Sequence, residues 1–292
     1  MTTKRVGWAA LASVAVLVLS AACGDGDQQS GPTPRPSPPS ATVTATPIAT
    51  PTQAPVTSTV AVYFVKAEKM APAQRSASGS GVGAAAVRAL LAGPTAAEQQ
   101  TGMTSAVPAG TRLRSLTISR GLAVVDLSGA FASGGGSFSM GARMAQLVTT
   151  LTQFPTVSQV RLWLDGTPAT TLGGEGLVVD KPFGRADVEE WLPAILVDSP
   201  ATGARITSPV RVRGSANVFE AVFVIEITDW DGRIVATRRV TASSGTGTRG
   251  TFDVKIPYQV DREGAGEVIV HSSSPKDGSR INVVETLVTV AP

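Results

Sequence analysis

The sequence is poor in the residues on which most catalytic and metal sites depend. Cysteine and histidine each occur once in 292 residues, and aromatic residues make up 5%. A lone cysteine cannot form an internal disulfide, and these counts exclude a metal site built from His and Cys. The tract Gly134–Gly136 lacks the Lys and Ser/Thr that follow in a phosphate loop. The composition therefore predicts no metal and no cofactor.

Charge is also scarce. Charged residues make up 16% of the chain, and the formal net charge is +3. Removal of a leader containing Lys4 and Arg5 would bring this charge close to neutral, so we expect no nucleic-acid partner. Arginines such as Arg211 and Arg213 occupy alternate positions of expected strands, and we interpret them as parts of solvated faces.

The amino terminus has the architecture of an export signal. Lys4 and Arg5 precede an apolar run that ends at Ser20-Ala21-Ala22-Cys23. These residues resemble the lipobox of bacterial lipoproteins, with Ser20 where Leu is usual. They predict a signal peptide over residues 1–22, lipidation (palmitate) at Cys23, and a location on the extracytoplasmic face of the cell membrane. An ordinary cleaved signal peptide and a membrane-spanning anchor are the alternatives, although the run is shorter than the roughly 20 residues that a span needs.

After Cys23 the chain is rich in Pro and Thr up to residue 58, a composition that cannot bury a core. Proline-rich chains extend by about 3 Å per residue. Residues 23–58 are therefore predicted to be a disordered tether that holds the following domains away from the membrane.

Residues 59–183 carry the pattern of an α+β domain. An apolar, β-branched run is followed by a helical pattern that stops at Gly93-Pro94, by a hairpin around Arg120-Gly121, and by a second amphipathic helix and strand. The predicted order is β-α-β-β-α-β, with two helices on one face of a small sheet. The expected elements are strand 60–65, helix 82–92, strands 113–119 and 122–127, helix 138–154, strand 158–164 and an extension at 177–179.

After a linker at residues 184–193, the helical period disappears. Short apolar runs separated by Gly, Pro, Asp and Ser clusters then recur over residues 194–292. This spacing predicts an all-β immunoglobulin-like sandwich without the cysteine pair of antibody domains. The expected strands are 195–197, 210–214, 221–228, 234–240, 250–256, 266–271 and 282–290.

Specific residues give these two domains a family resemblance. Leu90 to Thr95, Val107 to Thr111, Ala123 to Ser128, Thr149 to Phe154 and Val160 to Gly166 resemble, in order, the GerMN domain. Ser199-Pro200, Ser208-Pro209, Val212 to Ala216, Val218 to Ala221, Asp229 to Gly232, Phe252 and Ser272 to Gly278 resemble the immunoglobulin-like domain of bacterial spore germination proteins. The resemblance implies an envelope lipoprotein connected with sporulation or germination.

Candidate catalytic groups have simpler structural interpretations. His271 would need an acidic partner such as Asp253 or Asp277, but no Gly-x-Ser-x-Gly motif accompanies it. Paired carboxylates could in principle hydrolyse glycans, yet most of them fall in turns or at strand ends, where turn geometry explains them. The candidates are Asp126, Asp165, Glu175, Asp180, Glu220, Glu226, Asp229 and Asp231. We therefore predict that the protein is not an enzyme and that it has no catalytic residue.

Few residues suggest a binding site. Trp191 and Trp230 come nearest to a carbohydrate platform, although we favour packing between the domains as their use. We predict a non-catalytic binding or assembly module with envelope protein partners. A receptor for wall glycan or a small ligand is the alternative, and a cryptic glycan hydrolase ranks last. The sequence does not determine the oligomeric state.

Overall fold

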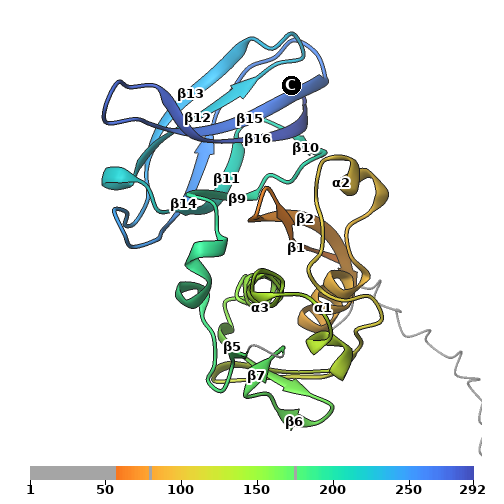
Figure 1. Cartoon of the computed structure of the whole chain (residues 1–292). Helices are drawn as coiled ribbons and strands as arrows, with labels where there is room; N and C mark the ends of the chain where they lie inside the picture. Colours follow the sequence, from red (N-terminus) through yellow and green to blue (C-terminus); the bar gives the residue numbers. More distant parts are fainter. Residues whose placement is uncertain (1–56, 79–80, 174–175) are drawn as a thin grey trace, which may run out of the picture. The chain divides into compact units, whose positions relative to one another are not determined.

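The computed structural model describes residues 57–78, 81–173 and 176–292 (Figure 1). Cys23, the signal peptide and almost all of the tether lie outside the described residues, and so does Glu175. None of the helices in the described ranges is both long enough and apolar enough to cross a bilayer.

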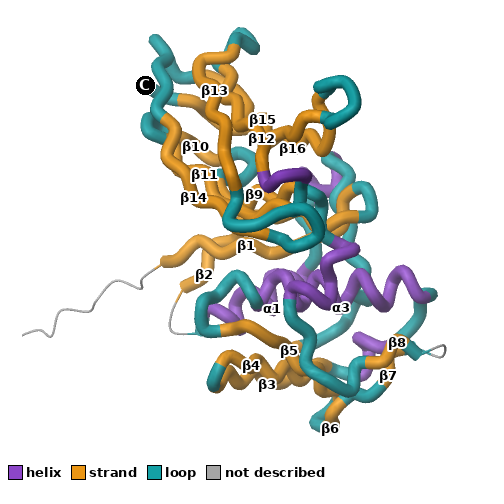
Figure 2. Tube along the Cα trace, turned by 90° about the vertical axis from the view of Figure 1, so that its left-hand side faces the viewer, coloured by secondary structure: helices purple, strands orange, loops and turns teal. Residues whose placement is uncertain are grey.

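The first domain stacks a strand ribbon, a helix layer and a sheet. Helices α1 (Val82–Ala92) and α3 (Ser137–Leu151) lie between the ribbon and the sheet, as Figure 2 shows. The ribbon pairs β1 (Thr57–Lys66) with β2 (Lys69–Ser78), and the sheet has the order β3-β4-β5-β6. The remaining elements are α2 (Ala96–Gln100), β3 (Leu113–Ser119), β4 (Gly121–Leu127), the 3-10 turn Gly129–Ala132, β5 (Val157–Leu164), β6 (Thr167–Pro168), β7 (Thr171–Leu172) and β8 (Leu177–Val178).

The predicted β-α-β-β-α-β order is present, with one addition that changes the layers. Strand β2 was not expected, and it pairs with β1 apart from the main sheet. The helices are therefore covered on two sides, whereas the sequence analysis placed them on one face of a single sheet. Helix α3 also ends at Leu151, three residues before the predicted end, and α2 was not foreseen.

Polar side chains of α3, and of Gln153 just after it, close the free edge of β1. Gln153 both donates to the carbonyl oxygen of Ala61 (2.6 Å) and accepts from its amide (2.9 Å). The hydroxyl of Thr150 accepts from the amide of Tyr63, and Gln146 donates to the carbonyl of the same residue. Because an unpaired strand edge invites pairing with other chains, these bonds protect the ribbon on this side.

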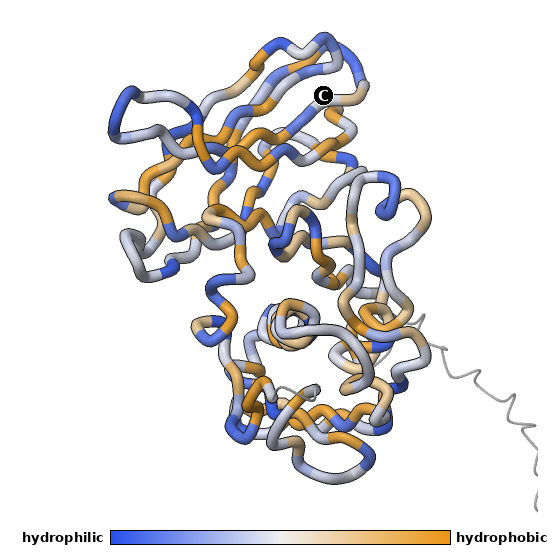
Figure 3. Tube along the Cα trace, viewed as in Figure 1, coloured by the Kyte–Doolittle hydropathy of each residue, from blue (hydrophilic) through white to orange (hydrophobic). Residues whose placement is uncertain are grey.

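The second domain is a sandwich of two sheets. One has the order β10-β16-β15-β12-β13 and the other the order β14-β11-β9. Apolar side chains from both sheets form one core, which includes Val212, Phe223 and Val268. The hairpin loop between β15 and β16 is largely hydrophilic (Figure 3). The strands are β9 (Ile195–Ser199), β10 (Ala204–Ile206), β11 (Val210–Ala216), β12 (Val222–Thr228), β13 (Ile234–Thr241), β14 (Gly250–Ile256), β15 (Gly264–Ser273) and β16 (Arg280–Val290), with a 3-10 turn at Phe219–Ala221.

All seven strands predicted for the second domain are present, and the immunoglobulin-like fold class is confirmed. Strand β10, which pairs in parallel with β16, was not predicted. Between the domains the 3-10 helix η2 spans Arg185–Trp191, within the predicted linker.

Candidate functional site

The sheet β14-β11-β9 has an outer face that carries the candidate site. Along β9, Ile195 and Val197 point into the second core, whereas Leu196 joins the core of the first domain. On β11, the buried Val212 separates the exposed Arg211 and Arg213. The alternation of a strand therefore divides these residues between a core and an outward face.

Asp198 of β9 connects this face to the ribbon of the first domain. The hydroxyl of Tyr63 donates to Asp198 Oδ1 at 2.5 Å, and the Gln74 amide donates to the Asp198 carbonyl at 3.2 Å. Tyr63 is fully buried, and this burial, followed by the charge of Asp198, raises the pKa of the phenol. The phenol therefore keeps its proton and acts as a donor across the physiological pH range.

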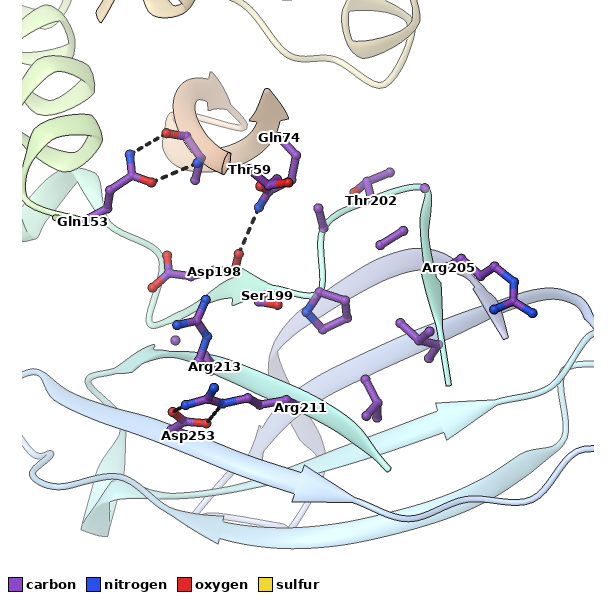
Figure 4. A pocket seen from close by; sticks show the side chains of 18 of the residues that line it. Thr59, Gln74, Gln153, Asp198, Ser199, Thr202, Arg205, Arg211, Arg213 and Asp253 are labelled. Atoms are coloured by element: carbon purple, nitrogen blue, oxygen red, sulfur yellow. Dashed lines mark hydrogen bonds and ion pairs between the residues drawn. The ribbon is translucent and has the colours of Figure 1, made fainter. Parts of the chain in front are cut away.

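A groove of about 970 Å³ opens beside this link (Figure 4). Its lining includes Gln74 from the ribbon, Gln153 from the turn after α3, and Arg211 and Arg213 from β11. A second hollow of about 630 Å³ shares Gln153 and Asp198 with the first. The two hollows thus flank the Tyr63–Asp198 contact, and the volume of the larger is in the range of ligand sites.

The arginines of the groove are not equivalent. Arg211 forms two hydrogen bonds with Asp253, at 2.7 and 2.5 Å, and these bonds lower the pKa of the Asp253 carboxyl. Arg205 also donates two hydrogen bonds, at 3.0 and 2.8 Å, both of them to one carboxylate oxygen of Glu263. Arg213 has neither an ion pair nor a side-chain hydrogen bond with any described residue. Its guanidinium is therefore available to a ligand.

Glu189 joins η2 to the second domain beside the smaller hollow. Its carboxylate accepts from Arg249 at 2.8 Å and from Asn217 at 2.9 Å. Arg249 also donates to the carbonyl oxygen of Pro193. Arg185, at the other end of η2, donates to the hydroxyl of Thr152 in the first domain.

We predict that the Glu189 contact weakens in acid. Burial, the largest influence, opposes ionisation, but the hydrogen bonds from Arg249 and Asn217 and the nearby positive charges outweigh it and lower the pKa of Glu189 below 4.5. A lowered folded pKa stabilises the protein above the unfolded pKa, and this stabilisation is lost as the pH falls through the folded value. Glu189→Gln should therefore cost about 1 kcal/mol at pH 7 and progressively less below about pH 4.5.

Urea denaturation of both forms between pH 3 and 7 would measure this difference. The control is Glu263→Gln, which removes an exposed ion pair with Arg205 and should change stability little. A Glu189→Gln effect that stays constant with pH would contradict the prediction.

The two tryptophans singled out from the sequence lie apart from the groove. Trp191 packs on α3, and its ring meets that of Phe138 edge-on at 4.9 Å between centroids. Trp230 is 42% exposed, but the guanidinium of Arg262 lies 3.4 Å from its ring centroid. The structure does not bring the two rings together on one face, and the groove lining contains neither.

The packing of Trp191 predicts an unusual effect at Gly141 of α3. Alanine normally stabilises a helix by about 1 kcal/mol relative to glycine. Here an added Cβ would lie 2.3 Å from Trp191 Cζ2. We expect Gly141→Ala to destabilise the protein by about 1–2 kcal/mol, and to stabilise it by about 1 kcal/mol in a Trp191→Ala background. Thermal denaturation of the four forms would show this reversal; a stabilised single variant would refute the contact.

The candidate catalytic carboxylates mostly serve backbone and arginine contacts. Asp126 accepts from the amide of Gly166, and Asp165 accepts from the amide of Gly129. Both also lie 3.4 Å from Arg114. Asp229 accepts two amide hydrogens of its own turn. Asp180, Glu220 and Asp231 are exposed.

His271 does not meet the acids considered for it. It is buried on β15, 3.8 Å from Glu226, and Glu226 is bonded to Arg280 at 2.8 Å. Asp253 pairs with Arg211, and Asp277 accepts from Ser279 in the hairpin loop. Across the described part of the chain, no three His, Cys, Asp or Glu side chains come together as possible metal ligands.

The contacts that join the two domains beside the groove were not predicted from the sequence. Tyr63 and Asp198 are 135 positions apart, and Gln74 and Asp198 are 124 apart. Arg211 and Arg213 were interpreted as parts of a solvated face, and Arg213 also lies in a segment that carries the family resemblance, but neither was predicted to bind a ligand. No local pattern marks Tyr63, Gln74 or Asp198, because their proximity depends on how the two domains pack.

Comparison with known families agrees with the fold. A family model described as "Germane: Sporulation and spore germination" matches residues 51–170. A second, the "Immunoglobulin-like domain of bacterial spore germination", matches residues 194–279. None of the curated proteins matches the chain.

Solved structures also resemble parts of the chain. The tandem GerMN domains of the sporulation protein GerM from Bacillus subtilis share 16% identity over 69% of this chain and 62% of that chain, with a TM-score of 0.39. The first GerMN domain of GerM alone shares 20% identity over 44% of this chain and 99% of that one, with a TM-score of 0.37.

A Clostridium perfringens protein described as a lipoprotein shares 22% identity over 47% of this chain and 93% of that chain, with a TM-score of 0.35. The two family matches follow one another along the chain, so a segment similar to GerMN domains is followed by one similar to the immunoglobulin-like domain of bacterial spore germination.

Proposed function

We propose that the protein is a lipid-anchored, extracytoplasmic module that assembles with envelope protein partners and carries out no catalysis. Its role would lie in sporulation, germination or another process of the cell envelope. The observation that carries the proposal is the union of two germination-type domains through Tyr63–Asp198 and Leu196, which leaves an open polar groove beside the junction. The Cys23 motif and the tether supply the anchor.

The anchor is tested by metabolic labelling. Labelled palmitate should join the full chain, and Cys23→Ala should abolish the label and move the protein out of the membrane fraction. A Cys23→Ala protein that remains with the membrane would refute lipid anchoring, because no other acceptor thiol exists in the chain.

Assembly is tested by photo-cross-linking in intact cells. A cross-linking amino acid at Thr202, an exposed residue of the groove lining, should capture a defined envelope protein. The control position is Thr237, which is exposed on β13 and lies outside the lining. Equal capture at both positions, or at neither, would count against a partner at the groove.

A receptor for wall glycan or a small ligand is the second candidate, and the volume of the groove favours it. Sedimentation of the purified protein with wall material would detect such binding. Loss of binding in Arg213→Gln would place the ligand in the groove, whereas loss in Trp191→Ala or Trp230→Ala would place it at a tryptophan.

A further inference from the structure

The outer face of β11 and β14 has more positive than negative groups. Arg213 lies directly across from Asp253, and Arg211 lies directly across from Lys255. All four residues are exposed on the same face of the sheet. One carboxylate therefore stands among three cations.

That carboxylate is already bound. Asp253 uses both oxygens to accept from Arg211, the diagonal neighbour, rather than from Arg213. Such two-pronged contacts are geometrically specific and stronger than single neutral hydrogen bonds. The positive charges of Arg213 and Lys255 also help to hold the pKa of Asp253 down, so its charge persists at neutral pH. Asp253, the acid directly across from Arg213, is therefore not available to pair with it.

The other acid of the groove does not replace this partner. Oδ1 of Asp198 accepts from the buried hydroxyl of Tyr63, and no ion pair joins Asp198 to Arg213 in the described part of the chain. Among the described cations that line the groove, Arg213 is thus the one without an acidic partner, and its guanidinium matches the planar shape of a carboxylate.

The other residues that line the groove indicate which class of molecule would present a carboxylate to Arg213. Gln74, Ser199 and Thr202 give the groove amide and hydroxyl groups. The aromatic lining residues, Tyr63 and Phe252, are both buried and offer no open ring for a sugar to stack on. A polar groove without an aromatic platform suits an extended peptide better than a glycan.

We propose that the groove receives an extended acidic segment of a partner protein, with one carboxylate on Arg213 of the lining and a second on Lys255, which lies outside the lining on the same face of the sheet. This inference rests on the proposed assembly function and names the chemistry of the partner. Side chains two residues apart on an extended chain are about 7 Å apart and point the same way. Arg213 and Lys255 are diagonal neighbours on β11 and β14, and such neighbours lie about 7–8 Å apart, so acidic residues at alternate positions match their spacing.

The probe is a fluorescent ten-residue peptide of alternating Ser and Glu, with an alternating Ser and Gln peptide as the neutral control. The chain from residue 24 onward should bind the acidic peptide and not the neutral one. Arg213→Gln should raise Kd about tenfold, because a hydrogen-bonded charge contact is lost. The matched control is Arg239→Gln, an exposed arginine of β13 outside the groove, which should leave Kd unchanged.

Three results would overturn the proposal. These are no preference for the acidic peptide, equal loss in the Arg213 and Arg239 variants, or tighter binding of oligogalacturonate, an acidic glycan, than of the peptide. Failure here can be told apart from failure of the assembly function. In that second case, cross-linking at Thr202 would capture no protein even though the purified chain binds the acidic peptide.

Discussion

Arg143→Met is expected to lower the free energy of unfolding by about 3 kcal/mol. The Arg143 side chain is almost fully buried on α3, and burial lowers its pKa. It donates to the carbonyl oxygens of Ala106, Phe131 and Gly134, at 2.7–2.9 Å, and to the hydroxyl of Ser139. Methionine preserves much of the stem but leaves these acceptors without a donor, and each such loss is costly inside a protein.

Two further variants separate the hydrogen bonds from helix propensity and charge. Arg88→Met changes an exposed arginine of α1 and should alter stability by less than about 0.5 kcal/mol. Arg143→Lys keeps the charge but cannot span the same fork of acceptors, so it should fall between the wild type and Arg143→Met. Urea denaturation gives the three values. A loss below about 1 kcal/mol in Arg143→Met would show that the loops do not depend on this residue.

The contacts of Arg143 also explain the glycine tract before α3. The sequence suggested no phosphate loop there, and the structure shows why glycine is needed. Gly134 and Gly135 both have positive φ, and a Cβ on Gly135 would lie 2.8 Å from the Arg143 guanidinium. The glycines allow the backbone to fold around a buried cation.

Periodic patterns correctly predicted the helices and strands that bury one apolar face in the core of their own domain. The amphipathic helix predicted over residues 138–154 is present as α3, and its apolar face, which includes Met140, Met144, Leu147 and Leu151, is buried. The β3–β4 hairpin is also confirmed, with Arg120 and Gly121 both at positive φ in its turn. In such elements the local sequence pattern and the tertiary environment favour the same structure, so the sequence alone is sufficient to predict them.

Strand β2 shows where local signals fail. Its sequence, Lys69–Ser78, contains three alanines, Pro72 and no β-branched residue, so it lacks strand propensity. Hydrogen-bonded pairing with β1 along its whole length stabilises the strand conformation that the local sequence does not favour. Tertiary context thus overrides propensity, and the two-sided cover of the helices could not be inferred without it.

The groove depends on the same kind of long-range order. Leu196 and Asp198 are neighbours of second-core residues along β9, yet they serve the contact with the first domain. When both faces of a strand are packed, apolar and polar residues do not alternate along it, so the sequence does not show which face contacts the other domain. Asp253 lies directly across from Arg213 but binds its diagonal neighbour Arg211. The sequence alone therefore does not show that Arg213 has no acidic partner.

Gly214→Ala should disrupt this arrangement at its centre and lower the stability of the second domain by about 3 kcal/mol or more. Gly214 lies in β11 at the irregularity where its pairing with β9 shifts. An added Cβ would lie 2.0 Å from the backbone oxygen of Leu196 and 2.7 Å from Phe252 Cζ. Because a backbone carbonyl cannot rotate away as a side chain can, β9 would have to separate from β11.

The displaced strand carries Asp198, so the variant should also lose the contact with Tyr63. Hydrogen exchange measured by mass spectrometry should show faster exchange in peptides that cover β9 and β11, while peptides from α3 change less. The control is Gly136→Ala, at the N-cap of α3, where an added Cβ meets nothing within 4 Å and the expected cost is about 0.5 kcal/mol. If Gly214→Ala exchanged like the wild type, the close approach of β9 to β11, and with it the floor of the groove, would be refuted.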